Sequence, residues 1–150
     1  MTKIYKGNIL FTSSPDHFEI LEDGYIAVNE QGTIEGLFVS LPQQYQNGSI
    51  VDYGNKLLIP GMYDLHVHAP QYRNQGMAMD LELLPWLQEY TFPEEANYAD
   101  AQYARVAYRH FVDNLRRQGT VRASVFATIH PVATKILAHL FHEAGMGAKI

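Results

Sequence analysis

The stretch that decides the fold covers residues 58–71 and reads LIPGMYDLHVHAPQ. An apolar run ends here in two histidines, His66 and His68, which are separated by a single residue. Because successive side chains of a β-strand point to opposite faces, the two imidazoles share a face, with Cα atoms roughly 6.5 Å apart. Both can then reach one metal ion at about 2.0–2.1 Å. The stretch therefore predicts a strand whose C-terminal end carries two metal ligands.

Asp64 has the same parity as the two histidines and lies one step deeper in the predicted strand. A carboxylate at this position can orient a metal-binding imidazole through a hydrogen bond, or it can cap a neighbouring loop. A catalytic zinc ion usually has three protein ligands and a water molecule, and an acid or base must move the protons. The two histidines are therefore an incomplete site, and the remaining groups must come from elsewhere.

The composition limits the possible classes of function. The chain has 150 residues, a hydrophobic content of 47% and a formal net charge of −5 at pH 7. With no basic patch beyond Arg116-Arg117, this charge argues against a protein that binds nucleic acid. The absence of cysteine excludes disulfides, thiol nucleophiles and thiolate zinc ligands, including the zinc site of cytidine-deaminase-type enzymes. No segment has the length of a signal-peptide core or a membrane span, so we expect a cytoplasmic protein without a membrane partner.

The pattern of residues changes at about residue 58. Residues 3–58 read as short strands joined by polar turns, including one at residues 22–24. After the histidine pair, residues 69–80 read as a long loop. A short apolar helix follows at residues 81–87, and the Tyr90 to Pro93 segment ends it.

The second half of the chain alternates between helices and strands. Residues 97–118 have the apolar stripe of a long amphipathic helix, with Asn97 as its expected N-cap and Gly119 after its last turn. A strand, a helix and the start of another strand follow, at residues 120–129, 131–145 and 146–150. This alternation is typical of a parallel α/β fold, in which the carboxyl ends of the strands meet at one rim.

His130 directly follows the second of these predicted strands. In (β/α) barrels the chemistry collects at the carboxyl ends of the strands, so His130 is a candidate for the rim of the site. A histidine that begins a helix can also simply cap it. The other histidines of the predicted helices, His110, His139 and His142, read as solvent-exposed residues.

Several motifs resemble, in order along the chain, the amidohydrolase superfamily, and in particular the N-terminal third of its guanine deaminases. They are Pro60-Gly61 with Asp64, His66 and His68; His68-Ala69-Pro70-Gln71-Tyr72; Tyr90-Thr91-Phe92-Pro93-Glu94-Glu95; Gly119-Thr120; and Phe126-Ala127-Thr128-Ile129-His130. The resemblance implies an α/β fold: part of a metal-dependent hydrolase (β/α)8 (TIM) barrel over residues 59–150, preceded by part of a small β-sandwich domain over residues 1–58.

The same resemblance implies a zinc-dependent hydrolase that converts guanine and water to xanthine and ammonia in purine catabolism. Iron stays open as the alternative metal, because two imidazoles bind either ion. His66 and His68 match the first two metal ligands of the family. His68, Ala69, Pro70 and Gln71 match its substrate-binding loop, where an amide, as both donor and acceptor, suits a guanine edge. The family also implies a homodimer for the full-length enzyme.

The length of the chain sets a limit on this expectation, because a (β/α)8 barrel needs about 250 residues. The acid and base residues that the resemblance implies lie beyond Ile150, so we expect an N-terminal fragment that is inactive alone. Two alternatives stay open. One is a related deaminase or chlorohydrolase that acts on another nitrogen heterocycle, and the other is a non-catalytic interaction module that retains the histidine pair.

Overall fold

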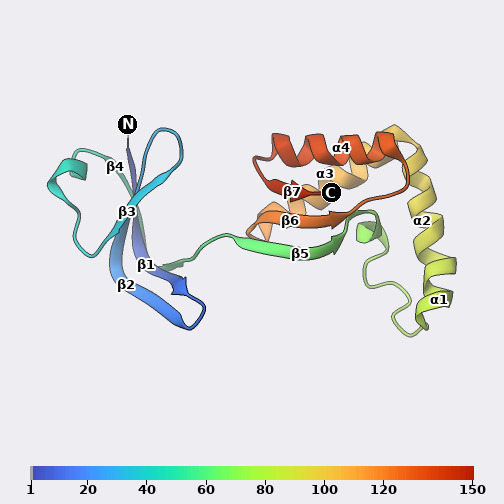
Figure 1. Ribbon diagram of the computed structural model, residues 1–150, viewed down its shortest axis with the longest axis horizontal. Helices are drawn as coiled ribbons and strands as arrows, with labels where there is room; N and C mark the ends of the chain where they lie inside the picture. The colour runs from blue at the N-terminus through green and yellow to red at the C-terminus, as the bar shows by residue number, and fades with distance from the viewer. Residues whose placement is uncertain (1) are drawn as a thin grey trace. The chain divides into compact units, whose positions relative to one another are not determined.

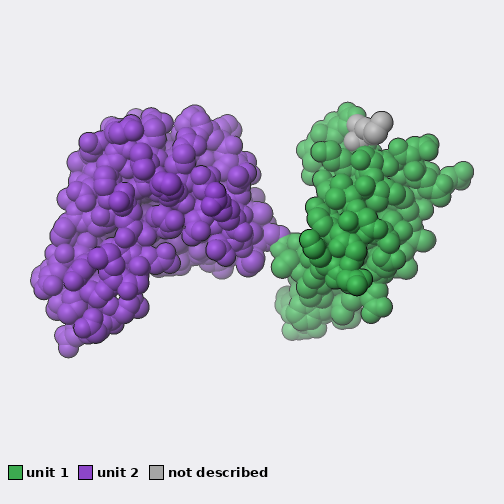
Figure 2. Space-filling view, turned by 180° about the vertical axis from the view of Figure 1, so that it is seen from behind, with its two compact units in different colours: residues 1–60 green, residues 61–150 purple. Residues whose placement is uncertain are grey.

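The structure is a computed structural model that describes residues 2–150. The chain divides into two compact units, one that ends at Pro60 and one from Gly61 to Ile150 (Figure 2). Each unit contains one β-sheet. The change of pattern near residue 58 therefore lies close to the point where one unit gives way to the next.

The first unit is a four-stranded sheet in the order β3-β2-β1-β4 (Figure 1). Its strands are β1 (Lys3–Ser14), β2 (His17–Val28), β3 (Ile34–Phe38) and β4 (Ser49–Leu58), and a short 3-10 helix, η1 (Gln43–Tyr45), precedes β4. The β1–β2 and β2–β3 pairs are antiparallel, whereas β1 and β4 are parallel. A sandwich requires a second, facing sheet, and residues 2–60 form only this one.

The strand β2 runs without a break through residues 22–24, where the sequence predicts a turn. Asp23 adopts a φ of 52° there, and the β1–β2 register shifts between Gly7 and Ile9, directly opposite. The residues expected to form a turn are therefore an irregularity within a long strand. Such a bulge bends the strand and leaves backbone groups unpaired.

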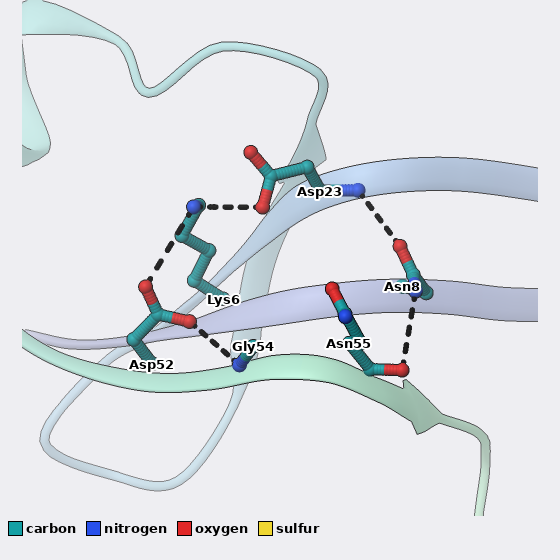
Figure 3. A network of polar contacts seen from close by, with 6 residues as sticks. All are labelled: Lys6, Asn8, Asp23, Asp52, Gly54 and Asn55. Carbon is teal, nitrogen blue, oxygen red and sulfur yellow. Dashed lines mark hydrogen bonds and ion pairs between the residues drawn. The ribbon is translucent and has the colours of Figure 1, made fainter.

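Polar side chains from β1 surround this irregularity (Figure 3). Lys6 Nζ lies 2.7 Å from Asp23 Oδ1 and 3.6 Å from Asp52 Oδ2. The backbone N–H of Asp23 donates to Asn8 Oδ1 (3.1 Å), and Asn8 Nδ2 donates to the carbonyl oxygen of Asn55 (3.3 Å). The hydrogen bond to the Asp23 carboxylate raises the pKa of Lys6. Side chains of β1 thus bind both neighbouring strands where the regular ladder is interrupted.

The second unit contains a three-stranded parallel sheet in the order β5-β6-β7. Its strands are β5 (Met62–His68), β6 (Thr120–Phe126) and β7 (Gly147–Lys149). The long helices α3 (Ala101–Arg117) and α4 (Pro131–Glu143) cover the same face of this sheet (Figure 1). Residues 61–150 thus contain three strands of a parallel α/β fold and no complete eight-stranded barrel.

The connection from β5 to α3 is more helical than the sequence predicts. It contains η2 (Ala69–Asn74), α1 (Leu83–Trp86), the π-helical turn η3 (Leu87–Thr91), α2 (Phe92–Ala96) and the 3-10 turn η4 (Asn97–Ala99). The prediction that the Tyr90 to Pro93 segment ends a helix is wrong. Pro93 lies in the first turn of α2, where a proline needs no N–H partner, so the helical path continues through it.

The helix α3 begins one turn later than predicted. Its N-cap is Asp100 rather than Asn97, and Asp100 Oδ1 accepts hydrogen bonds from the backbone N–H groups of Gln102 (2.6 Å) and Tyr103 (3.1 Å). A carboxylate in this position satisfies N–H groups that have no partner within the helix. The predicted C-terminal glycine is confirmed, since Gly119 has a φ of +87° just after the last turn.

The core of the second unit lies between the sheet and the helices α3 and α4. Most of its members are apolar residues that the helical and strand periodicity bring to one side: Ala104, Ala107, Tyr108, Phe111 and Val112 of α3, Ala133, Ile136, Leu137, Leu140 and Phe141 of α4, and Ala123 and Val125 of β6. Ala69, Tyr98 and Met146 complete it. The rings of Phe111 and Phe141 meet edge to face, with centroids 6.3 Å apart. Burial of this apolar surface holds the carboxyl ends of β5 and β6 side by side. No helix within residues 2–150 combines the length and the hydropathy that a membrane span requires.

Candidate metal and ligand site

The two histidines of β5 converge at the carboxyl end of the strand. His66 Nε2 and His68 Nε2 are 3.2 Å apart, and the ring centroids are separated by 5.2 Å. This is the arrangement that the two-residue spacing on a strand predicts. His66 is exposed and His68 is half-buried, so the nitrogens meet where a ligand from solvent can approach.

Phe126, the last residue of β6, holds the two imidazoles in place. It pairs with His68 in the parallel β5–β6 register, and its ring stacks on His68 with centroids 4.7 Å apart and planes 11° apart. The same ring lies 4.8 Å from the His66 ring. The sequence motif from Phe126 to His130 includes this residue, but the motif predicts no role for Phe126 in the site. The signal was its place in the second half of the next predicted strand, residues 120–129, where parallel pairing brings it beside His68.

The distance between the histidine nitrogens fits a shared metal ion. Two ring nitrogens that face each other as acceptors repel, unless a hydrogen or a cation lies between them. Two ligands at about 2.0–2.1 Å from a tetrahedral ion are about 3.3–3.4 Å apart, and the observed separation is 3.2 Å. Among residues 2–150, however, no group of three or more His, Cys, Asp and Glu side chains is placed to hold a metal.

Asp64 contacts the backbone rather than a ring. Its Oδ1 accepts a hydrogen bond from the backbone N–H of His66, at 3.1 Å. The β5–β6 register shifts between Asp64 and Val67, so this N–H lies where the strand pairing is irregular. The contact fixes the backbone at His66 within the strand, whereas the sequence offers this carboxylate either an imidazole to orient or a neighbouring loop to cap.

The helix η2 follows His68 directly and contains the other predicted ligand-binding residues. Ala69 and Pro70 are completely buried in the second unit. Gln71 is half-buried, and its Nε2 lies 3.4 Å from Nδ1 of His68. Of the three residues after His68, therefore, Gln71 alone presents a polar side chain next to the histidine pair, and the other two shape the turn that positions it.

A cleft of about 840 Å³ adjoins these groups. Its lining includes Asp64, His66, His68 and Gln71, together with the aromatic side chain of Trp86. The volume lies within the range of small-molecule sites, which are apolar with a few polar groups that fix orientation. Trp86 is held by a hydrogen bond from its Nε1 to the carbonyl oxygen of Met77, at 3.0 Å.

The structure does not bring His130 to the histidine pair. His130 is half-buried at the start of α4, where its backbone N–H donates to Thr128 Oγ1 at 3.2 Å. It lines a separate hollow of about 390 Å³, together with Phe92, Glu95 and Ile129. His130 therefore lies at the carboxyl end of the β6 segment, in a different recess from His66 and His68.

Two polar contacts anchor η2 to the helical segment that follows it. Asn74 Nδ2 donates to Thr91 Oγ1 at 3.2 Å, and both residues are buried. Glu94 Oε1 accepts from the hydroxyl of Tyr103 at 2.6 Å and lies 4.0 Å from Nε of Arg73. Burial, followed by the hydrogen bond to Glu94, raises the pKa of Tyr103. These contacts fix the segment that carries Gln71.

Comparison with known proteins gives relatives along the whole chain. No protein-family model matches it. The guanine deaminase of Dictyostelium discoideum is 37% identical over 164 residues, a match that covers 99% of this chain and 36% of the relative. The crystal structure of guanine deaminase from C. acetobutylicum with bound guanine is 44% identical and has a TM-score of 0.92, over 99% of this chain and 35% of that chain.

A more distant neighbour shows the fold alone. A mutant of atrazine chlorohydrolase from Arthrobacter aurescens, complexed with zinc and atraton, has a TM-score of 0.80 at 13% identity, over 97% of this chain and 34% of that chain. The chain spans about a third of the length of each of these proteins. Over its whole length, the chain is homologous to the N-terminal portion of guanine deaminases and has part of the amidohydrolase fold.

Proposed function

We propose that the chain is the N-terminal portion of a guanine deaminase, which hydrolyses guanine to xanthine and ammonia. The observation that carries this proposal is the convergence of His66 and His68 beside Gln71, in a chain that is 44% identical to an enzyme crystallised with guanine. We assign the second unit to the first βα units of a TIM barrel. We assign the first unit to part of a β-sandwich domain.

His66 and His68 would hold one divalent metal ion through their Nε2 atoms. Zinc is the favoured ion, because a neighbour of the same fold is complexed with it, and iron is the alternative. A zinc ion supplies hydrolytic chemistry at neutral pH, since it lowers the pKa of water to about 7. A catalytic zinc needs three protein ligands. Because no third group joins the pair within residues 2–150, we expect the 150 residues alone to be inactive.

The segment from His68 to Gln71 would bind the substrate. Gln71 offers the amide that hydrogen-bonds guanine, while Ala69 and Pro70 fix the turn that carries it. In the reaction, the oxygen of water bonds to the ring carbon that carries the amino group, and the carbon–nitrogen bond breaks. One proton of the water passes to the amino group, which leaves as ammonia, and the other passes to the neighbouring ring nitrogen. No residue of this chain is assigned to these proton transfers. Asp64 would fix the backbone of His66 through its hydrogen bond to the N–H group. His130 would lie at the outer rim of the site.

The proposal extends to the setting of the whole enzyme. Guanine is a small-molecule substrate, and its conversion to xanthine belongs to purine catabolism in the cytoplasm. We propose a homodimer, as the family resemblance implies. Neither nucleic acid nor a membrane is a proposed partner, in keeping with the net charge of −5.

A chimeric enzyme tests the proposed activity. In it, residues 1–150 replace the corresponding N-terminal segment of the guanine deaminase from C. acetobutylicum. With zinc, the folded chimera should convert guanine to xanthine, which is measured by the change in ultraviolet absorbance, and it should leave chlorinated triazines unchanged. Circular dichroism and thermal unfolding establish that the chimera is folded. A folded chimera that hydrolyses a triazine and not guanine would contradict the proposal.

A further inference from the structure

Gln71 is the one side chain within residues 2–150 with a described hydrogen-bond contact to the Nδ1 atom of either histidine of the pair. Its Nε2 lies 3.4 Å from Nδ1 of His68, on the opposite side of the imidazole from the Nε2 atom that faces His66. The partner of the second ring nitrogen decides which nitrogen of a metal-binding histidine carries the hydrogen. Gln71 therefore occupies the position from which the His68 ring is oriented.

The contact can form in two ways. If the Gln71 amide nitrogen donates to His68 Nδ1, the hydrogen of the neutral ring is on Nε2, where it points at His66. If the amide turns by half a rotation, its carbonyl oxygen accepts from an Nδ1–H group, and Nε2 is left with a free lone pair. Only the second arrangement lets His68 bind a metal through Nε2 in the neutral state that a ligand requires.

We propose that Gln71 is a positioning residue for His68, and that metal binding turns its amide so that the carbonyl faces Nδ1 and the NH2 group faces the cleft. The inference rests on the proposed metal site. It adds a specific consequence, because Gln71 then presents a hydrogen-bond donor to the ligand. A heterocycle would be recognised there through an acceptor, either a ring nitrogen or a carbonyl oxygen.

The neighbouring residues fit this role. Ala69 and Pro70, which precede Gln71, are completely buried. Asn74, which follows it at the end of η2, is hydrogen-bonded to Thr91. The backbone is therefore fixed on both sides of Gln71. Asp64 accepts a hydrogen bond from the backbone N–H of His66. Gln71, rather than Asp64, therefore orients the imidazole ring of His68.

The test is a titration of the 150-residue chain with zinc chloride, for the unchanged protein and for Gln71→Met and Gln71→Glu. Glutamate retains an acceptor for the Nδ1–H group, whereas methionine has a similar length and a weak acceptor only. Loss of an outer partner of a metal-binding histidine typically lowers metal affinity by about 10- to 100-fold. We therefore expect Gln71→Met to weaken zinc binding by that factor and Gln71→Glu to bind zinc at least as tightly as the unchanged chain.

Nuclear magnetic resonance provides a second readout. Long-range 1H–15N spectra should place the His68 hydrogen on Nδ1 when zinc is bound. The nuclear Overhauser effect between the Gln71 amide hydrogens and Hε1 of His68 should be strong without zinc and clearly weaker with it, because the rotation moves these hydrogens away from Nδ1. Backbone 1H–15N spectra establish that each variant is folded.

The outcomes separate this inference from the proposed function. If zinc binding requires His66 and His68 but Gln71→Met binds as tightly as the unchanged chain, the positioning role of Gln71 is wrong and the metal site stands. An Overhauser effect of unchanged intensity with zinc bound would also overturn the amide rotation. If His66→Ala and His68→Ala leave zinc binding unchanged, the metal site itself is wrong.

Discussion

Two regions of the second unit carry pairs of histidines, and only one pair converges. At the end of β5, His66 and His68 bring their Nε2 atoms to 3.2 Å, against the ring of Phe126 and the amide of Gln71. On the surface of α4, His139 lies 3.1 Å from Glu143 one turn away, and its side chain is 62% exposed. His142 is three residues from His139, yet no contact joins the two rings among the described interactions. Convergence depends on the strand spacing and on neighbours that hold the rings.

The largest expected effect comes from removing one histidine of the converging pair. His66→Ala or His68→Ala should lower the zinc affinity of the chain by more than about 100-fold, because loss of a ligand costs more than loss of an outer partner. The matched control is the double change His139→Ala with His142→Ala, which should leave the affinity unchanged. Isothermal titration calorimetry measures all three. Equal losses in the two regions would remove the distinction between them.

The second-largest effect is expected from the hydrogen bond between Asn74 and Thr91, which anchors η2. Thr91→Val removes the partner of the buried Asn74 amide at nearly constant side-chain size, and an unsatisfied buried polar group costs about 1–3 kcal/mol. We expect the free energy of unfolding of the second unit to fall by that amount in urea titrations. Thr91→Ser keeps the hydroxyl and should retain most of the stability. If valine and serine destabilise equally, the hydrogen bond to Asn74 is not the cause.

The aromatic support of the pair should have a smaller effect. Phe126 stacks on His68 and contacts His66, and aromatic pairs contribute about 0.5–1.5 kcal/mol beyond burial. Phe126→Ala should therefore weaken zinc binding by about 2- to 13-fold, because each 1.4 kcal/mol is a factor of ten. Phe92→Ala is a control, since Phe92 is an exposed aromatic residue in the recess of His130. A zinc affinity that is unchanged in Phe126→Ala would show that the backbone alone orders the rings.

The smallest effect is expected from the ion pair of the first unit between the half-buried Lys6 and the exposed Asp23. The pKa of Lys6 is raised above 10.5, mainly by its hydrogen bond to Asp23. Because the pKa of Lys6 is higher in the folded state than in the unfolded state, Lys6 stabilises the fold fully at pH values below its pKa in the unfolded state. This stabilisation is lost as the pH rises through its pKa in the folded state. The melting temperature should therefore fall slightly more steeply above pH 10.5 in the unchanged chain than in Lys6→Met. Identical pH profiles would show that the ion pair does not stabilise the fold.

The sequence predicts most of the fold because its signals are local. The apolar stripe of α3 and the glycine that ends it follow directly from periodicity and from the backbone freedom of Gly119. The start of α3 is less predictable, because Asn97 and Asp100 are both good caps. Helix η4 occupies the intervening turn, so Asp100 takes the role. The prediction at Pro93 is wrong for a similar reason, because a proline can follow the end of one helix or lie in the first turn of the next.

The site is predictable only in part, because its supporting contacts connect residues far apart in the sequence. The spacing of His66 and His68 predicts their convergence without any tertiary information. The stacking of Phe126 depends on the register of β6, and the separation of His130 from the pair depends on the path of the chain after β6. The contact between Gln71 and Nδ1 of His68 depends on η2 being helical rather than a loop.

The most direct test of the account is the steady-state rate of xanthine formation by the folded chimera, compared between two double variants. His66→Ala with His68→Ala should abolish turnover of guanine, because both proposed metal ligands are lost. His139→Ala with His142→Ala should retain the rate of the unchanged chimera. Xanthine formation at the unchanged rate by the first variant, with folding and zinc supply verified, would contradict the central claim that the histidine pair of β5 belongs to the catalytic metal site.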